Sequence, residues 1–194
     1  MQIERAVIGV TSLGPGNRLG IWTNGCHRRC KGCVSERLQK PCPENEVSIE
    51  EYFDNFYLEI VDGITVSGGE PFDQLSELSL LVDYFHSKGF EDILIYTGFT
   101  LEELLDKKDE KIDSIFKKIS VLIDGPYIQE LDTGKGNLTG SDNQRIIFLK
   151  PEFEQKYKEY YSDTRKMQEH HLGNVLLATG IPNGEYIEKF KKKQ

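Results

Sequence analysis

Three cysteines within eight positions constrain this chain more than any other feature. Cys26, Cys30 and Cys33 have the spacing C-x3-C-x2-C and follow a short apolar run over residues 19–23. Three thiolates on one short loop can each bind a different iron of a cubane cluster, which leaves the fourth iron open to a small molecule. An open metal position is typical of a catalytic site. The spacing therefore predicts a metal centre in loop 24–34, with these three cysteines as its ligands.

A structural zinc site is the alternative that this loop leaves open. Zinc prefers four Cys or His ligands, and Cys42 or His27 could supply the fourth. Zinc sites usually contain two C-x-x-C pairs, whereas this loop contains one. Cys42 lies between Pro41 and Pro43, as expected of an ordinary loop thiol. The loop alone favours a cluster over zinc.

Composition narrows the class of protein and its location. The 194 residues include 24 Lys and Arg against 32 Asp and Glu, a net charge of −8 that argues against nucleic acid as the main partner. The first residues lack the pattern of a signal peptide, and no apolar run approaches the roughly 20 residues that cross a membrane. We therefore expect a cytoplasmic protein, no membrane contact, and cysteines that are thiols or metal ligands rather than disulfides. The length suits one domain over residues 1–194.

Apolar runs that alternate with amphipathic stretches predict an α/β fold with a mostly parallel sheet. A helix is expected over 74–88, where Leu78, Leu81, Val82 and Phe85 recur at helical spacing. The repeated units are too few for an eightfold barrel, so an open or partial barrel fits better. The expected strands cover 6–10, 19–23, 64–67, 93–97, 120–123, 145–149 and 175–178.

Local signals outside the strands predict helix starts and polar segments. Thr100 is expected to cap one helix, and Ser48 to cap another with Glu51 at capping-box spacing. Residues 150–173 form a charged, insertion-like segment that is expected to be a solvated helix or loop, and 191–193 a solvated tail. Residues 134–137 are expected to form a flexible hairpin or a lid over the site.

A second motif follows the strand over 64–67. It reads Gly68-Gly69-Glu70-Pro71. Two glycines at a strand end expose backbone groups to a ligand, and Glu70 adds an acceptor for a charged amine. On its own, this sequence could equally be an ordinary strand-to-helix turn.

The cysteine motif followed by Ser-Gly-Gly-Glu-Pro resembles the radical S-adenosylmethionine (SAM) superfamily. The resemblance implies a [4Fe–4S] cluster whose open iron is chelated by the methionine amino and carboxylate groups of SAM. It also implies that electron transfer from the reduced cluster cleaves SAM to a 5′-deoxyadenosyl radical, which abstracts a hydrogen atom. In this reading, the protein positions the cofactors and excludes water.

A narrower resemblance extends over most of the chain and indicates the activating proteins of anaerobic (class III) ribonucleotide reductase. Four further motifs carry it, in this order along the chain: Gly14–Arg18, Tyr96–Thr100, Leu122–Tyr127 and Gly140–Arg145. It implies an oxidoreductase with a shortened partial (β/α) barrel that installs a glycyl radical on the large reductase subunit. It also implies an electron donor such as flavodoxin or ferredoxin.

The resemblance assigns roles to individual residues. Cys26, Cys30 and Cys33 would be cluster ligands, and Gly68, Gly69 and Glu70 would hold the methionine end of SAM. Thr97 and Asp124 would contact the ribose or methionine groups, and Arg145 would pair with the cofactor carboxylate or orient a partner peptide. For these last three, a structural turn or a buried ion pair is an equal alternative.

The residues after Cys33 depart from the subgroup, which usually shows an Asn and then a Thr there. This chain reads Val34-Ser35-Glu36-Arg37 instead. The departure leaves the cluster chemistry intact but keeps two other functions open. One is a radical enzyme acting on another peptide or a small molecule, and the other is a non-enzymatic zinc or iron–sulfur binding module.

Overall fold

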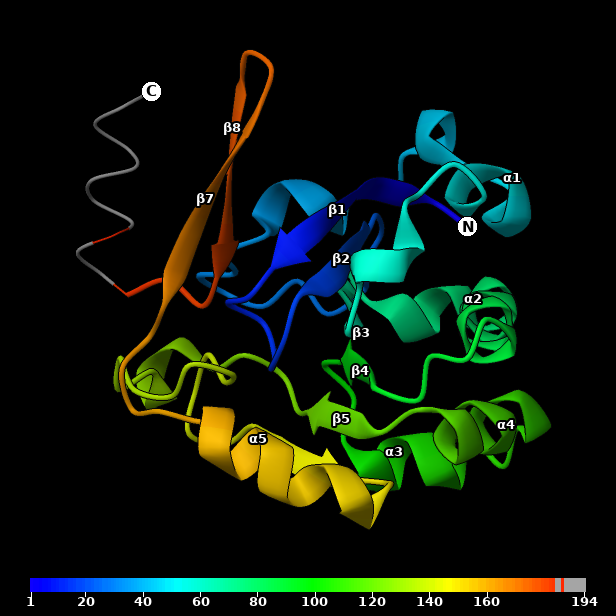
Figure 1. Ribbon diagram of the computed structural model, residues 1–194. Helices are drawn as coiled ribbons and strands as arrows, with labels where there is room; N and C mark the ends of the chain where they lie inside the picture. Colours follow the sequence, from blue (N-terminus) through cyan, green and yellow to red (C-terminus); the bar gives the residue numbers. More distant parts are fainter. Residues whose placement is uncertain (184–185, 187–194) are drawn as a thin grey trace.

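The computed structural model describes residues 1–183 and 186, which form a six-stranded sheet and a separate two-stranded hairpin (Figure 1). The sheet has the spatial order β1-β2-β3-β4-β5-β6, the same as the order along the chain. Its strands are β1 (Ile3–Val10), β2 (Arg18–Thr23), β3 (Gly63–Gly68), β4 (Ile93–Tyr96), β5 (Val121–Asp124) and β6 (Arg145–Phe148). The hairpin consists of β7 (Met167–Leu172) and β8 (Val175–Gly180).

The four central strands, β2 to β5, run parallel, and the two outer strands pair antiparallel to their neighbours. The predicted α/β class and mostly parallel sheet are therefore confirmed. All seven predicted strands are present, but the last of them belongs to the hairpin rather than to the sheet. Strand β7 was not predicted. Because parallel strands end at one edge, the loops after β2, β3, β4 and β5 gather there.

Four helices cover one face of the sheet: α1 (Ile49–Phe53), α2 (Leu75–Ser87), α3 (Leu101–Asp106) and α4 (Glu110–Lys118). Helix α2 lies within one residue of its predicted bounds at each end. Its predicted apolar stripe is fully buried in the main core, together with Ile64 and Val66 of β3. Burying a leucine-sized side chain contributes about 1.5–3 kcal/mol, so this stripe is what fixes α2 on the sheet.

The predicted helix caps have different outcomes. At α3, Thr100 Oγ1 accepts a bond from Glu103 N (3.1 Å) and Thr100 N donates to Glu103 Oε2 (2.8 Å), which is a full capping box. Ser48 makes no side-chain bond at α1, so the capping box predicted there is wrong. Helix α1 is only five residues long and is held by the buried side chains of Ile49 and Phe53.

The opposite face of the sheet is covered by α5 (Glu154–Tyr160), within the charged segment 150–173. A helix was expected here, but not a buried contact. Tyr157 is only 1% exposed and packs against Leu94, Val121 and Ile123. The buried Tyr157 side chain thus packs an otherwise charged helix against this face of the sheet.

The loop over residues 134–137 is also fixed in place, so the predicted lid is wrong. Gly136 N donates to Asp163 O (3.2 Å), and Asn137 Nδ2 donates to Tyr160 O (3.1 Å). Asn137 is fully buried. The predicted tail at 191–193 lies outside the described residues.

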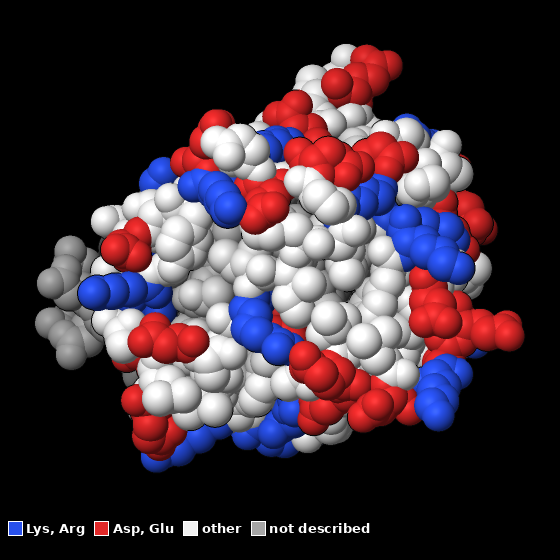
Figure 2. All heavy atoms as spheres, turned by 90° about the horizontal axis from the view of Figure 1, so that it is seen from below, with Lys and Arg blue, Asp and Glu red and all other residues white. Residues whose placement is uncertain are grey.

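Figure 2 shows a face on which acidic and basic side chains are interspersed around a largely uncharged centre. Both signs are abundant, as the 24 basic and 32 acidic residues require. Within residues 1–183 and 186, no helix combines the length and the apolar character needed to cross a membrane.

Arg18, the last residue of the first narrower motif, is completely buried where β2 begins. Its Nε donates to Thr65 Oγ1 (2.6 Å) and its Nη2 to Ile64 O (2.6 Å), and it pairs with Asp92 at 3.2 Å. Asp92 also accepts a bond from the Tyr157 hydroxyl (2.7 Å). Arg18 therefore ties β2, β3, the start of β4 and α5 together at the edge opposite the cysteine loop.

Replacing Arg18 by methionine should destabilise the fold by about 3–5 kcal/mol, because Asp92 would lose its buried charged partner and keep only one other, Lys156, which is partly exposed. Urea unfolding measures the change. Arg37→Met is the matched control, since Arg37 is exposed and pairs with Glu4 at 3.7 Å; it should cost about 1 kcal/mol or less. Equal losses in the two variants would contradict the role of Arg18.

Candidate active site

The cysteine loop leaves β2 beside the glycine turn that follows β3. The two strands are in register up to the pair Thr23 and Gly68. Beyond that pair, Gly69 N donates to Thr23 O and Glu70 N donates to Gly25 O, both at 2.8 Å. The loop that carries the three cysteines is thus joined to the glycine turn through the backbone.

This close approach requires glycine at both positions of the turn. A Cβ on Gly68 would lie 2.3 Å from Thr23 N, and Gly68 has a φ of +111°. A Cβ on Gly69 would lie 2.1 Å from Gly25 O. The sequence predicted that the glycines admit a ligand. The structure adds that the glycines also allow the backbone at the start of the cysteine loop to pack directly against the turn.

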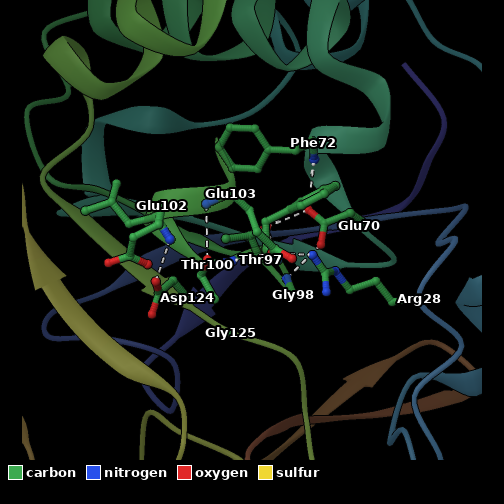
Figure 3. Close-up of polar contacts among 12 residues, drawn as sticks. Arg28, Glu70, Phe72, Thr97, Gly98, Thr100, Glu102, Glu103, Asp124 and Gly125 are labelled. Carbon is green, nitrogen blue, oxygen red and sulfur yellow. Dashed lines mark hydrogen bonds and ion pairs between the residues drawn. The ribbon is translucent and has the colours of Figure 1, made fainter. Parts of the chain in front are cut away.

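The Glu70 carboxylate is buried, with 1% of the residue exposed, and is engaged by the chain itself (Figure 3). Oε1 accepts bonds from Phe72 N (3.1 Å) and Thr97 Oγ1 (2.8 Å), and Oε2 accepts one from Gly98 N (2.7 Å). Burial raises its pKa to about 6, although the bonds from Gly98, Phe72 and Thr97 act in the opposite direction. Glu70 and Thr97 thus brace the ends of β3 and β4 against each other.

Two side chains hold the cysteine loop against its surroundings. Arg28 Nη2 donates to Glu103 Oε2 (2.7 Å), and its guanidinium lies 4.4 Å from the centroid of the Phe99 ring (Figure 3). His27 N donates to Asp73 Oδ2 (2.9 Å), and His27 Nδ1 lies 2.7 Å from Asp73 Oδ1. The loop is therefore fixed both to the start of α3 and to the turn before α2.

The three cysteines are free thiols, each partly exposed. Burial raises the pKa of the Cys26 thiol. Among the described residues, no three His, Cys, Asp or Glu side chains form a group that could hold a single metal ion. Of the two residues considered as a fourth zinc ligand, Cys42 is bonded to Glu44 (3.4 Å) and His27 to Asp73.

Asp124 and Arg145 come together as an ion pair. Asp124 is fully buried; its Oδ1 accepts a bond from Arg145 Nε (3.0 Å) and its Oδ2 one from Leu101 N (2.7 Å). Arg145 also pairs with Glu102 (2.7 Å), and its hydrogen bond lowers the pKa of Glu102 to about 2. Glu102 was not singled out from the sequence, although an acidic residue in the first turn of a helix was a usable signal. This network fixes the start of α3 and matches the buried-ion-pair alternative.

A cavity of about 810 Å³ lies between the cysteine loop and the hairpin. Cys33 and Gly32 border it on the loop side, and Ser67 and Tyr96 border it at the ends of β3 and β4. The volume is within the range of about 300–1,000 Å³ that is usual for ligand sites. The sequence did not predict the hairpin side of this cavity.

Comparison with known proteins identifies the family. The family model described as a 4Fe–4S single cluster domain matches residues 12–147. An anaerobic ribonucleoside-triphosphate reductase-activating protein from Vibrio cholerae is 31% identical over 142 residues, which cover 69% of this chain and 88% of that protein. The protein of that name from Enterobacteria phage T4 is 30% identical over 140 residues, with 69% and 85% covered. The chain belongs to this family of iron–sulfur activating proteins.

Members of this family are radical SAM enzymes, so this chain is an enzyme whose cofactors are an iron–sulfur cluster and SAM. The residues present fit both groups. Three free thiols on one loop could supply the ligands for three irons and would leave the fourth iron open. The cavity beside Cys33, which Ser67 borders just before the glycine turn, gives a SAM-sized molecule room next to that loop.

Glu70→Gln should change how stability depends on pH. The carboxyl has a pKa of about 6 when folded, against its ordinary value of 4.5, so between pH 4.5 and 6 the folded state keeps a proton that the unfolded state loses. The stability contributed by the protonated carboxyl is therefore lost as the pH rises through this window, by about 2 kcal/mol. The variant lacks this loss, so its unfolding free energy relative to the parent should rise by about 1.5 kcal/mol from pH 4.5 to 6.5.

Urea unfolding of both proteins across this pH range measures the difference. Glu36→Gln, at an exposed position in the loop after Cys33, is the control and should show no trend. A constant difference between Glu70→Gln and the parent would mean that Glu70 is not the buried, proton-retaining group described here.

Proposed function

We propose that this chain activates an anaerobic ribonucleotide reductase by generating a glycyl radical on its large subunit. The observation that carries this proposal is the backbone junction of the cysteine loop with the glycine turn beside a cavity. This arrangement holds a three-thiolate loop and a candidate SAM site at one edge of the sheet. The family relatives are activating proteins of this reductase, which supports the same target for this chain.

Cys26, Cys30 and Cys33 would hold the cluster in this proposal, and Gly68, Gly69 and Glu70 would lie at the methionine end of SAM. When bound, the reduced cluster supplies the one electron that cleaves SAM, and this cleavage supplies the radical that takes a hydrogen atom from glycine. Arg28, Arg29 and Lys31 lie within the cysteine loop, where their charges offset that of a thiolate-ligated cluster.

The protein's own contribution is positioning. Glu70 fixes the glycine turn relative to β4, and Arg28 fixes the cysteine loop relative to α3. Asp124 and Arg145 fix the start of α3, the helix whose Glu103 binds Arg28. In this proposal Thr97 does not contact SAM directly, because its hydroxyl already donates to Glu70. It acts by holding Glu70 in place.

The fold and the electron supply are part of the same proposal. A short sheet with helices on its outer face and a cavity on its inner side supports a shortened partial (β/α) barrel. The electron would come from an external donor such as flavodoxin or ferredoxin, as the resemblance to the reductase-activating proteins implies.

The direct test uses the anaerobically reconstituted protein, dithionite, SAM and the reductase from the same organism. We expect 5′-deoxyadenosine together with a glycyl-radical signal on the reductase in electron paramagnetic resonance spectra. Formation of 5′-deoxyadenosine with no radical on the reductase would favour another peptide or small molecule as the substrate. The absence of both products, with iron and sulfide bound, would contradict the proposal.

Cys30→Ala should abolish both cluster assembly and SAM cleavage, because two thiolates leave a second iron of the cluster without its ligand. Cys42→Ala is the matched control: it removes a partly exposed thiol outside the loop and should retain the iron content and the activity of the parent. Iron and sulfide content and 5′-deoxyadenosine formation measure the two effects. Full cleavage by Cys30→Ala would rule out the ligand assignment.

A further inference from the structure

The hairpin β7–β8 forms one side of the cavity and lies outside residues 12–147, which carry the family match. Residues 176–182 all border the cavity, opposite Cys33 and the residues that follow it. A molecule that fills the cavity therefore touches the cysteine loop on one side and the hairpin on the other. The hairpin is a second wall, separate from the elements that bear the cluster and SAM motifs.

The chemistry of this wall differs from that of the rest of the chain. Charged residues make up 29% of the sequence, but residues 176–182 (Leu-Leu-Ala-Thr-Gly-Ile-Pro) contain none. The charged residues that border the cavity, Glu4, Arg5, Glu36 and Arg37, belong to β1 and to the loop after Cys33 rather than to the hairpin. Small and apolar residues instead suit the close approach of an uncharged peptide segment, such as one that contains glycine.

The wall is held rigidly against the edge of the sheet. Gln168 Nε2 donates to Gly9 O (2.6 Å), and Gln168 Oε1 accepts a bond from Thr11 N (2.8 Å). Thr179 Oγ1 lies 2.9 Å from Ser12 Oγ. Arg165 is buried and donates to Pro182 O (2.9 Å), which fixes the far end of the wall. A wall fixed in advance orders a flexible peptide at a lower entropic cost.

The tip of the hairpin also carries exposed apolar side chains. Leu172 and Val175 face each other across the turn and are 40% and 49% exposed. Figure 1 shows this tip standing clear of the sheet and helices. Exposed apolar side chains that adjoin a cavity wall are typical of a surface that another protein covers.

We propose that the β7–β8 hairpin is the docking wall for the glycine-bearing segment of the partner protein. The segment enters along the hairpin, packs against residues 176–182 and presents its glycine to the cysteine-loop side of the cavity. This inference rests on the proposed function and extends it, because it assigns recognition of the partner to a part of the chain that lies outside the family match.

The test compares two leucine substitutions of identical chemistry. Leu176→Glu places a charge on the wall, whereas Leu80→Glu places it on an exposed site of α2, on the opposite face of the sheet. Both holoenzymes are assayed with dithionite, SAM and the reductase, and the readout is the number of glycyl radicals formed per 5′-deoxyadenosine. We expect this ratio to fall at least tenfold in Leu176→Glu and to stay at the parent value in Leu80→Glu. Binding of the reductase to each immobilised holoenzyme is the second measurement and should weaken only for Leu176→Glu.

Each other outcome has a distinct meaning. An unchanged ratio and unchanged binding in Leu176→Glu overturn the role of the hairpin and leave the proposed function standing. A loss of 5′-deoxyadenosine in the same proportion as the radical means that the wall serves SAM or the fold, which also overturns the inference. If the parent protein itself forms 5′-deoxyadenosine but no glycyl radical, then the partner assumed in both proposals is wrong.

Discussion

Two backbone hydrogen bonds, from Gly69 N to Thr23 O and from Glu70 N to Gly25 O, are the constraint on which the site depends. They exist because β2 and β3 are parallel, adjacent and in register to their last residues. The loops that follow must then leave side by side, and a side chain at either glycine would force them apart. The position of the cysteine loop relative to the glycine turn is therefore a consequence of strand register. Neither loop could be moved independently without breaking the pairing of two core strands.

Glu70 connects the glycine turn to the end of the next strand, β4. A buried carboxylate is costly, and three donors from two segments offset the cost here. Two of the donors, Thr97 Oγ1 and Gly98 N, come from the turn that leads into α3, where Arg28 of the cysteine loop also binds. The cysteine loop is thus connected to the end of β4 and to α3 by side-chain contacts, in addition to its backbone bonds to the glycine turn. A loop held on both sides presents its thiols in one arrangement, as cluster binding requires.

The sequence predicted what depends on local patterns. The strands, the buried stripe of α2, the helix cap at Thr100, the α/β class and the iron–sulfur cofactor followed from periodicity, helix-start signals and motif spacing. It failed where one long-range contact overrides composition. Tyr157 sits among charged residues, so nothing local distinguishes α5 from a solvated helix, and β7 (Met-Gln-Glu-His-His-Leu) has no alternation because only β8 pairs with it. Asp124 and Arg145 are 21 positions apart, and their pairing follows from the β5–β6 register, which the sequence does not display.

Helix α5 and the β7–β8 hairpin cover parts of the sheet that its six strands leave exposed. A sheet of six strands has two edges and an inner face, and a full barrel would close both with further strands. In this chain α5 fills the inner face near Arg18, and the hairpin is bonded to the β1 edge through Gln168 and Thr179. The hairpin contacts involve neither the β2–β3 register nor the cysteine loop. The residues that border the far side of the cavity can therefore differ between related proteins while the cluster loop and the glycine turn keep their geometry. If the hairpin docks the partner as proposed, recognition of the partner and the radical chemistry rest on different segments of the chain and are separable.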